Sequence, residues 1–101
     1  MINFLNIKKG FSIYHEDKSH WAYCYCYIIK DKPEVYKYIT DPWDAYKYCR
    51  YIKDLPVIRK YITDSLDAYC YCRYVKDRPE VRKLITEDEH LQWYKEWKKK
   101  Q

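Results

Sequence analysis

Cysteine and histidine are the residues of this 101-residue chain that could bind a metal or carry out chemistry. Two Cys-Tyr-Cys strings, Cys24 to Cys26 and Cys70 to Cys72, invite a zinc interpretation. On a helix, however, residues two apart point about 200 degrees away from each other, so neither pair can close on one ion. We therefore expect free thiols, no metal and no cofactor.

His20 and Cys24 are a second candidate, because residues at i and i+4 share a helix face. The equivalent pairs further along the chain are Trp43 with Lys47 and Leu66 with Cys70, so neither pair combines histidine with cysteine. This replacement argues against a required set of metal ligands.

Catalysis has little support in the sequence. A nucleophile needs a base and an orienting group, and no catalytic signature surrounds the three histidines, His15, His20 and His90. The single glycine of the chain excludes a glycine-rich loop for phosphate. We expect a protein that is not an enzyme.

The strongest signal is an internal repeat, whose equivalent strings begin at Ala22, Ala45 and Ala68. It aligns residues 22–26, 45–49 and 68–72, and it continues through three Lys-Asp-x-Pro strings that begin at Lys30, Lys53 and Lys76. A fixed short period means that one supersecondary unit stacks on copies of itself.

The period predicts an all-α fold, a solenoid-like array of three 23-residue helix-turn-helix repeats that forms one domain over residues 1–101. The repeats are residues 18–40, 41–63 and 64–86. Residues 1–17 are expected to be an N-terminal cap, either a hairpin or, as we favour, a degenerate helical pair. Residues 87–101 are expected to be a C-terminal capping segment, with a closing helix over 87–99.

The middle repeat shows why the units are helical. Asp41 followed by Pro42 is typical of a helix start, and the x-Pro step at Pro56 predicts a helix end near Asp54. The apolar residues between these points recur at i, i+3, i+4 and i+7, on one helix face: Ala45, Tyr48, Cys49 and Ile52. This pattern predicts that Cys49 and its equivalents, Cys26 and Cys72, pack in the core.

A second, very short helix is predicted to open at each Lys-Asp-x-Pro string. Residues 31–34 and 77–80 resemble a capping box with proline in the first turn, so we expect Asp31, Asp54 and Asp77 to cap these helices. Helices of two turns are unstable alone in water, so they depend on packing against their neighbours.

Charge and composition limit where the protein acts. The net charge is +5, and residues 1–17, 18–40, 41–63, 64–86 and 87–101 carry 0, +2, +2, +1 and 0. Five cysteines without a secretory leader predict a reducing compartment, the cytoplasm of a host cell. No apolar stretch approaches the roughly 20 residues that span a bilayer, so we expect no membrane contact.

Stacked repeats place equivalent residues in rows, and two rows are candidates for partner binding. The first combines tyrosines with arginines at i+4: Tyr23, Tyr46, Tyr69, Arg50 and Arg73. The second lies on the short helices: Lys37, Lys60, Lys83, Arg59 and Arg82. Tyrosine and arginine are typical of interface hot spots, although tyrosine rings also fill the grooves between helices.

Three functions follow from these rows. The first is a protein-binding module whose Tyr/Arg face blocks a site on its partner. The second is a nucleic-acid-binding protein, in which the lysines meet phosphates and the tyrosines stack on unpaired bases. The third is a structural homo-oligomer, because an open-ended stack can pair with a second copy.

The string Asp-x-x-x-Ala-Tyr-x-Tyr-Cys-x-Tyr-Ile/Val-Lys followed by Pro-Glu-x-x-Lys-x-Ile resembles the short helical repeats of poorly characterised phage and giant-virus proteins. The resemblance covers residues 18–86. Those repeats commonly have alanine where Cys26, Cys49 and Cys72 stand, and a longer turn with glycine. The resemblance implies a viral accessory protein that inhibits a host defence component, for example one of the CRISPR type.

Overall fold

The computed structural model describes residues 18–101, and within this range the chain forms helices and no strand. The elements, in chain order, are α2 (Lys18–Cys24), the π-helical η2 (Tyr25–Ile29), the 3-10 helix η3 (Pro33–Tyr38), α3 (Pro42–Tyr51), α4 (Pro56–Arg59), α5 (Ser65–Tyr74), α6 (Pro79–Arg82) and α7 (Asp88–Lys99). The all-α prediction is therefore confirmed for the described residues. The predicted N-terminal cap, residues 1–17, lies outside them.

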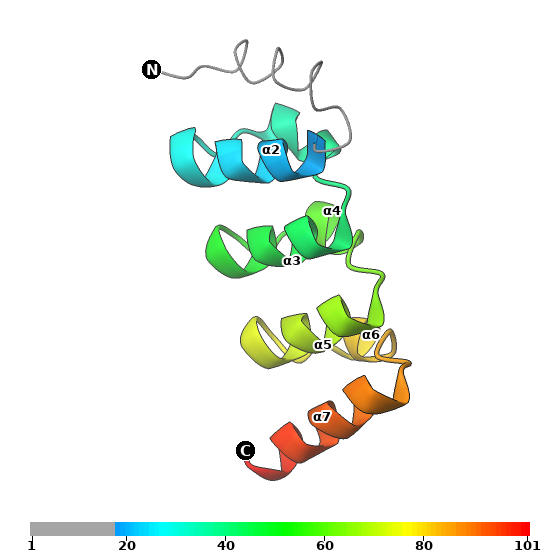
Figure 1. Ribbon diagram of the computed structural model, residues 1–101. Helices are drawn as coiled ribbons and strands as arrows, with labels where there is room; N and C mark the ends of the chain where they lie inside the picture. Colours follow the sequence, from blue (N-terminus) through cyan, green and yellow to red (C-terminus); the bar gives the residue numbers. More distant parts are fainter. Residues whose placement is uncertain (1–17) are drawn as a thin grey trace.

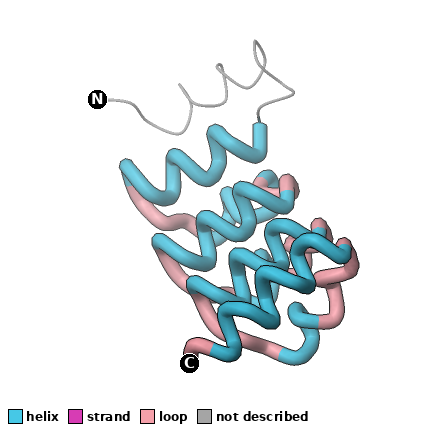
Figure 2. Tube along the Cα trace, turned by 60° about the horizontal axis from the view of Figure 1, so that its bottom comes forward, coloured by secondary structure: helices cyan, strands magenta, loops and turns pink. Residues whose placement is uncertain are grey.

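The helices form two layers (Figures 1 and 2). One layer contains the first helices, which are α2 with its continuation η2, then α3, α5 and α7, and each contacts the next. The other layer contains the short helices η3, α4 and α6, and each packs on the first helix that precedes it in the chain. The closing helix expected over 87–99 is confirmed as α7.

Local signals explain where the longer helices begin and end. The Oδ2 atom of Asp41 accepts hydrogen bonds from the backbone N–H groups of Trp43 (3.1 Å) and Asp44 (3.3 Å), which caps α3 as predicted. Asp64, at the same position before α5, makes no such bond. At the other end, the carbonyl of Tyr48 accepts from two successive N–H groups, and α3 ends at Tyr51, shortly before Asp54.

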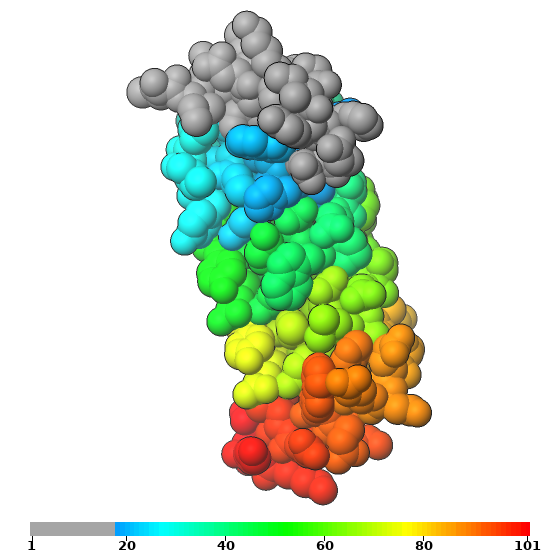
Figure 3. All heavy atoms as spheres, in the orientation of Figure 1, coloured from blue at the N-terminus to red at the C-terminus, as the bar shows by residue number. Residues whose placement is uncertain are grey.

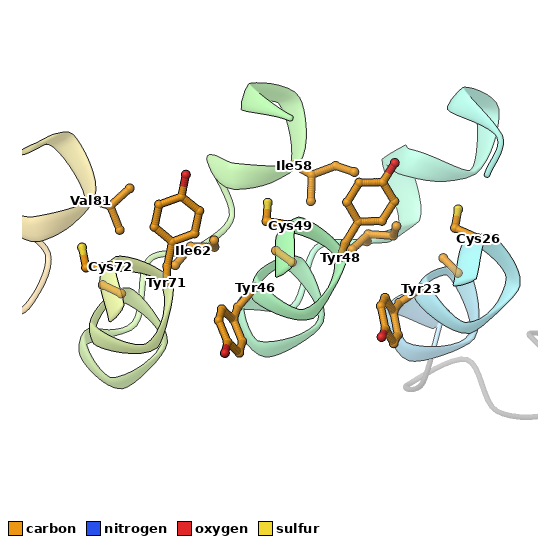
Figure 4. Close-up of a cluster of buried hydrophobic side chains, with 14 of the residues drawn as sticks. Tyr23, Cys26, Tyr46, Tyr48, Cys49, Ile58, Ile62, Tyr71, Cys72 and Val81 are labelled. Carbon is orange, nitrogen blue, oxygen red and sulfur yellow. The ribbon is translucent and has the colours of Figure 1, made fainter. Parts of the chain in front are cut away.

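The core lies between the two layers, and its composition recurs in each helical pair (Figure 4). The first helices contribute alanine, tyrosine and cysteine, and the short helices contribute valine and isoleucine: Ala45, Tyr48, Cys49, Ile58 and Ile62, with their equivalents. Burial raises the pKa of Cys49 to about 12 and the pKa values of Cys26 and Cys72 to about 11. The prediction that these thiols pack in the core is confirmed, and they stay protonated at neutral pH.

Tyrosine hydroxyls join each helical pair to the pair before it. Each donates a hydrogen bond to an aspartate 17 residues earlier: Tyr48 to Asp31 (2.7 Å), Tyr71 to Asp54 (2.6 Å) and Tyr94 to Asp77 (2.8 Å). The prediction that these aspartates cap the short helices is wrong. The cap positions are Lys32, Leu55 and Arg78, none with a side-chain cap bond, because the carboxylates face the next first helix instead.

Arginines complete the environment of these carboxylates. Arg59 Nε donates to Asp54 Oδ1 at 3.0 Å, and Arg78, from the following helical pair, donates to Asp54 Oδ2 at 3.1 Å. Burial acts to raise the pKa of Asp54, but the hydrogen bonds from Tyr71, Arg59 and Arg78 outweigh it and lower the pKa below its ordinary value. The carboxylate is thus ionised and fully engaged inside the stack.

Serine hydroxyls provide a further link at the other end of the first helices. Ser65 Oγ accepts from the backbone N–H groups of Thr86 and Glu87, both at 3.1 Å, and Ser19 Oγ makes the equivalent pair of bonds to Thr40 and Asp41. Pro42 occupies this position in the middle repeat and has no hydroxyl. The tyrosine bond links three pairs of successive units, counting α7 as the last unit. In two of these three cases, a serine bond adds a second link at the other end of the first helix.

We predict that Tyr71→Phe lowers the free energy of unfolding by about 1.5–3 kcal/mol, because it removes a buried hydrogen bond to a charged group. Tyr51→Phe is the matched control, since Tyr51 is 50% exposed and makes no equivalent bond to an aspartate. Urea unfolding followed by circular dichroism measures both. Equal stabilities for the two variants would contradict this role of the tyrosine.

Candidate functional site

The tyrosines of the first predicted row do not form an exposed surface. Tyr23, Tyr46 and Tyr69 are 8%, 2% and 6% exposed, and the rings of Tyr23 and Tyr46 lie between neighbouring first helices (Figure 4). Burial, followed by the nearby Tyr27 hydroxyl, raises the pKa of Tyr23 to about 12. The expected exposed row of rings is therefore absent from the described residues, because close stacking of the first helices covers all three, and their contact with a partner stays a prediction.

A side chain of the next first helix lies against two of these rings, those of Tyr23 and Tyr69. Lys47 Nζ lies 4.8 Å from the centroid of the Tyr23 ring, and the Trp93 ring lies 5.6 Å from the Tyr69 ring. These contacts explain why Lys47 stands where Cys24 and Cys70 stand in the other repeats. The position serves to cover a ring, and side chains of different chemistry can do so.

The arginines of that row do reach solvent. Arg50 Nη1 donates to the Tyr46 hydroxyl at 2.9 Å, and Arg73 Nη1 donates to the Tyr69 hydroxyl at 2.7 Å. Both arginines are exposed, so the buried tyrosines hold them at the surface in a defined orientation.

A row of large apolar side chains includes the residues that follow Arg50 and Arg73. It consists of Ile28, Tyr51, Tyr74 and Trp97, which occupy equivalent positions of successive first helices, and Trp97 among them is half-buried. The first three are 73%, 50% and 47% exposed. The Arg50 guanidinium lies 4.9 Å from the Tyr51 ring and 4.5 Å from the Tyr74 ring, so it bridges two neighbouring first helices. Sequence reasoning missed this row, although its period was visible.

Exposed large apolar side chains are concentrated on the first helices. Among the described residues, those on the first helices are Tyr27, Ile28, Ile29, Trp43, Tyr51, Leu66, Tyr74 and Trp93. The short helices contribute one such residue, Val57, which is 50% exposed. Figure 3 shows the stack from α2 to α7 as one continuous surface in the orientation of Figure 1.

We define the first-helix face by eight side chains that are exposed together: Tyr27, Trp43, Arg50, Tyr51, Leu66, Arg73, Tyr74 and Trp93. Near its C-terminal end, a shallow groove of about 410 Å³ lies between α5 and α7. Arg73, Trp93 and Trp97 line this groove, together with Glu96 and Lys100. The face therefore offers aromatic area, fixed cations and one depression.

The lysines and the arginines of the second predicted row have different surroundings in the structure. Lys37, Lys60 and Lys83 are exposed on the short helices or directly after them. Arg59 and Arg82 instead donate to Asp54 and Asp77, each at 3.0 Å. The lysines remain candidates for partner binding, whereas the arginines are already paired within the fold.

The side chains of Cys24, His20 and Asp44 are arranged like the nucleophile, base and carboxylate of a catalytic triad. Cys24 Sγ lies 3.5 Å from His20 Nε2, and His20 Nδ1 lies 3.6 Å from Asp44 Oδ1. The chemistry, however, opposes a nucleophile. Burial raises the pKa of the Cys24 thiol above its ordinary value despite the charge of Lys47. Cys24 also lies within a continuous helical segment, whose N–H groups bond to helix carbonyls and cannot stabilise an oxyanion.

Within residues 18–101, no three histidine, cysteine, aspartate or glutamate side chains gather where they could bind a metal ion. None of the described helices combines the length and the apolar character that crossing a bilayer requires.

The chain matches no protein-family model, no curated protein and no solved structure.

Two buried aspartates occupy the third position of α3 and α5. Asp44 lies 3.5 Å from Lys47 Nζ. Asp67 has no such cation within residues 18–101, and burial, followed by the charges of Asp64 and Asp41, raises its pKa from 3.8 to about 6. Its carboxyl group therefore binds a proton more tightly in the folded chain than in the unfolded chain, so this group's penalty on stability grows as pH rises from 3.8 to about 6.

We predict that Asp67→Asn stabilises the protein at pH 7.5, by up to roughly 3 kcal/mol, because it removes a buried charge without a cationic partner. The difference from the wild type should shrink towards zero as pH falls to 4, where the native carboxyl group is neutral. Urea unfolding at a series of pH values measures this. Asp44→Asn, which breaks an ion pair, is the control and should give no stabilisation. A difference independent of pH would contradict the assignment.

Proposed function

We propose that this chain is a solenoid-like array of three 23-residue repeats that binds another protein through the first-helix face and carries out no reaction. One observation carries the proposal: the exposed large apolar side chains are concentrated on the first helices, where they alternate with Arg50 and Arg73. Large contiguous apolar area on the surface of a folded protein is typical of an interaction site.

The residue types of this face support binding to a protein. Tryptophan, tyrosine and arginine are the residues that most often dominate the free energy of protein association. Arg50 and Arg73 are also held in place, because each donates to a buried tyrosine hydroxyl and lies against exposed rings. A side chain that is ordered before binding loses less conformational entropy when the partner arrives.

The charge of the face indicates the chemistry of its partner. Lys47, Arg50 and Arg73 are cations on its central helices, and the aspartates there, Asp44 and Asp67, are buried. A complementary surface would combine apolar groups with carboxylates. Coverage of such a surface would block it sterically. The resemblance to phage and giant-virus repeats implies that the partner is a host defence component. That identity stays a prediction.

We predict that alanine at Arg50, Tyr51, Arg73 and Tyr74 together abolishes capture of the partner while helicity is retained, because the four side chains are exposed and contribute little to the core. The chain and the variant are immobilised in parallel and exposed to lysate of the cells that carry it. Captured proteins are quantified by mass spectrometry, and circular dichroism verifies the fold.

The matched control replaces four exposed residues of the other layer with alanine: Lys37, Val57, Lys60 and Lys83. The proposal is supported if the wild type and this control capture the same protein and the first variant captures at least tenfold less of it. If both variants capture identical sets of proteins, the first-helix face is not the binding surface. Light scattering on the same samples tests the homo-oligomer, whose mass would halve in the first variant if two copies pair through this face.

A further inference from the structure

The positive charge of the chain is concentrated on one side of the stack. The segments that contain the turns and short helices, residues 30–40, 53–63 and 76–86, carry +1, +2 and +2, which equals the whole net charge of +5. The first-helix segments 18–29, 41–52, 64–75 and 87–101 carry +1, 0, −1 and 0. The short-helix layer is therefore cationic, and the first-helix layer is neutral overall.

Three lysines of this layer are available to an external anion. Asp54 and Asp77 bind arginines and, for Asp77, Lys98, so these carboxylates are already neutralised. Lys37, Lys60 and Lys83 have no carboxylate within ion-pair distance among residues 18–101. Lys37 Nζ and Lys60 Nζ lie over tyrosine rings, 5.3 and 5.2 Å from the centroids of Tyr38 and Tyr61.

A groove lies between successive short helices. The groove between η3 and α4 has a volume of about 380 Å³ and is lined by Pro33, Tyr36, Lys37, Val57, Lys60 and Tyr61. The groove between α4 and α6, about 230 Å³, is its counterpart in the next repeat, with Arg59 in place of Tyr36, Glu80 in place of Val57 and Leu84 in place of Tyr61. The groove between η3 and α4 therefore combines two rings with two lysines, whereas the next groove has one lysine, Lys60, and the acidic Glu80.

We propose that the short-helix layer binds single-stranded nucleic acid. Lys37, Lys60 and Lys83 contact phosphates along one strand, and the groove between Tyr36 and Tyr61 receives a base against its rings. The carboxylates of an acidic peptide would use the lysines, but they offer no ring to stack against Tyr36 and Tyr61, whereas every nucleotide of a strand carries both a phosphate and a base. A flexible strand can match its phosphates to one lysine per helical pair, whereas the phosphates of a duplex are fixed.

This inference does not depend on the protein-binding proposal, because the two surfaces share no residue. The first-helix variant with alanine at Arg50, Tyr51, Arg73 and Tyr74 should bind nucleic acid as the wild type does. Loss of one function therefore leaves the other measurable.

The test is fluorescence anisotropy of a fluorescein-labelled thymidine 20-mer with the full chain. With three phosphate contacts on a single strand, affinity should fall about twentyfold between 50 and 200 mM salt. Lys37→Gln, Lys60→Gln and Lys83→Gln combined should remove most of this affinity and flatten its salt dependence. The control, Lys95→Gln, Lys99→Gln and Lys100→Gln combined, lowers the net charge equally, from +5 to +2, and should keep affinity within about twofold.

A fourth variant separates stacking from charge. Tyr61→Ala should weaken binding about tenfold and leave the salt slope unchanged, because it removes a ring and no cation. Circular dichroism verifies that each variant is folded.

Four results would overturn the proposal. The first is no anisotropy change up to about 100 μM chain in 50 mM salt, the weak end of non-specific binding. The second is an equal loss in both triple-lysine variants, which indicates diffuse charge. The third is competition by poly-glutamate as effective as by unlabelled strand, which indicates an acidic polypeptide. The fourth is equal affinity for a 20-base-pair duplex.

Discussion

The hydrogen bond between a tyrosine hydroxyl and the aspartate of the preceding helical pair is the interaction on which this structure depends. Asp54 shows why: it lies in a turn, it is partly buried, and Tyr71 and Arg78, both from the next pair, supply two of its three donors. An ionised carboxylate that loses such donors inside a fold is costly. The short helices cannot persist alone, so this bond and the core fix each pair on the next.

Both surfaces follow from that stacking. Because the first helices pack against one another, the side chains of Tyr23, Tyr46 and Tyr69 are buried. The hydroxyls of Tyr46 and Tyr69 accept hydrogen bonds from the exposed arginines Arg50 and Arg73. The residues that follow those arginines remain outside and form an aromatic face. On the other layer, arginines neutralise Asp54 and Asp77, and Lys37, Lys60 and Lys83 form no ion pair with a carboxylate within residues 18–101. One packing arrangement thus separates an aromatic face with the exposed cations Arg50 and Arg73 from a layer whose exposed side chains include Lys37, Lys60 and Lys83.

Helical period predicted the local fold well. The all-α class, the buried Cys49 and its equivalents, and the closing helix α7 follow from apolar spacing and from caps. Period alone gives the direction of a side chain around its own helix but not the distance to the next helix. Tyr46 was therefore placed at a surface that the neighbouring helix covers. Asp54 was interpreted as a cap because its donor, Tyr71, lies 17 residues away in another pair. The sequence shows that Tyr51 and Tyr74 occupy equivalent positions of the repeat, but it does not show that both side chains are exposed.

A double-mutant cycle on Tyr71 and Asp54 tests the central claim most directly. Tyr71→Phe, Asp54→Ala and their combination are compared with the wild type by urea unfolding, which measures the coupling free energy of the two side chains, including the part that Arg78 carries by donating to both. The structure predicts a coupling of about 1 kcal/mol or more. Additive effects, with a coupling within about 0.3 kcal/mol of zero, would contradict the claim that this bond holds successive helical pairs together.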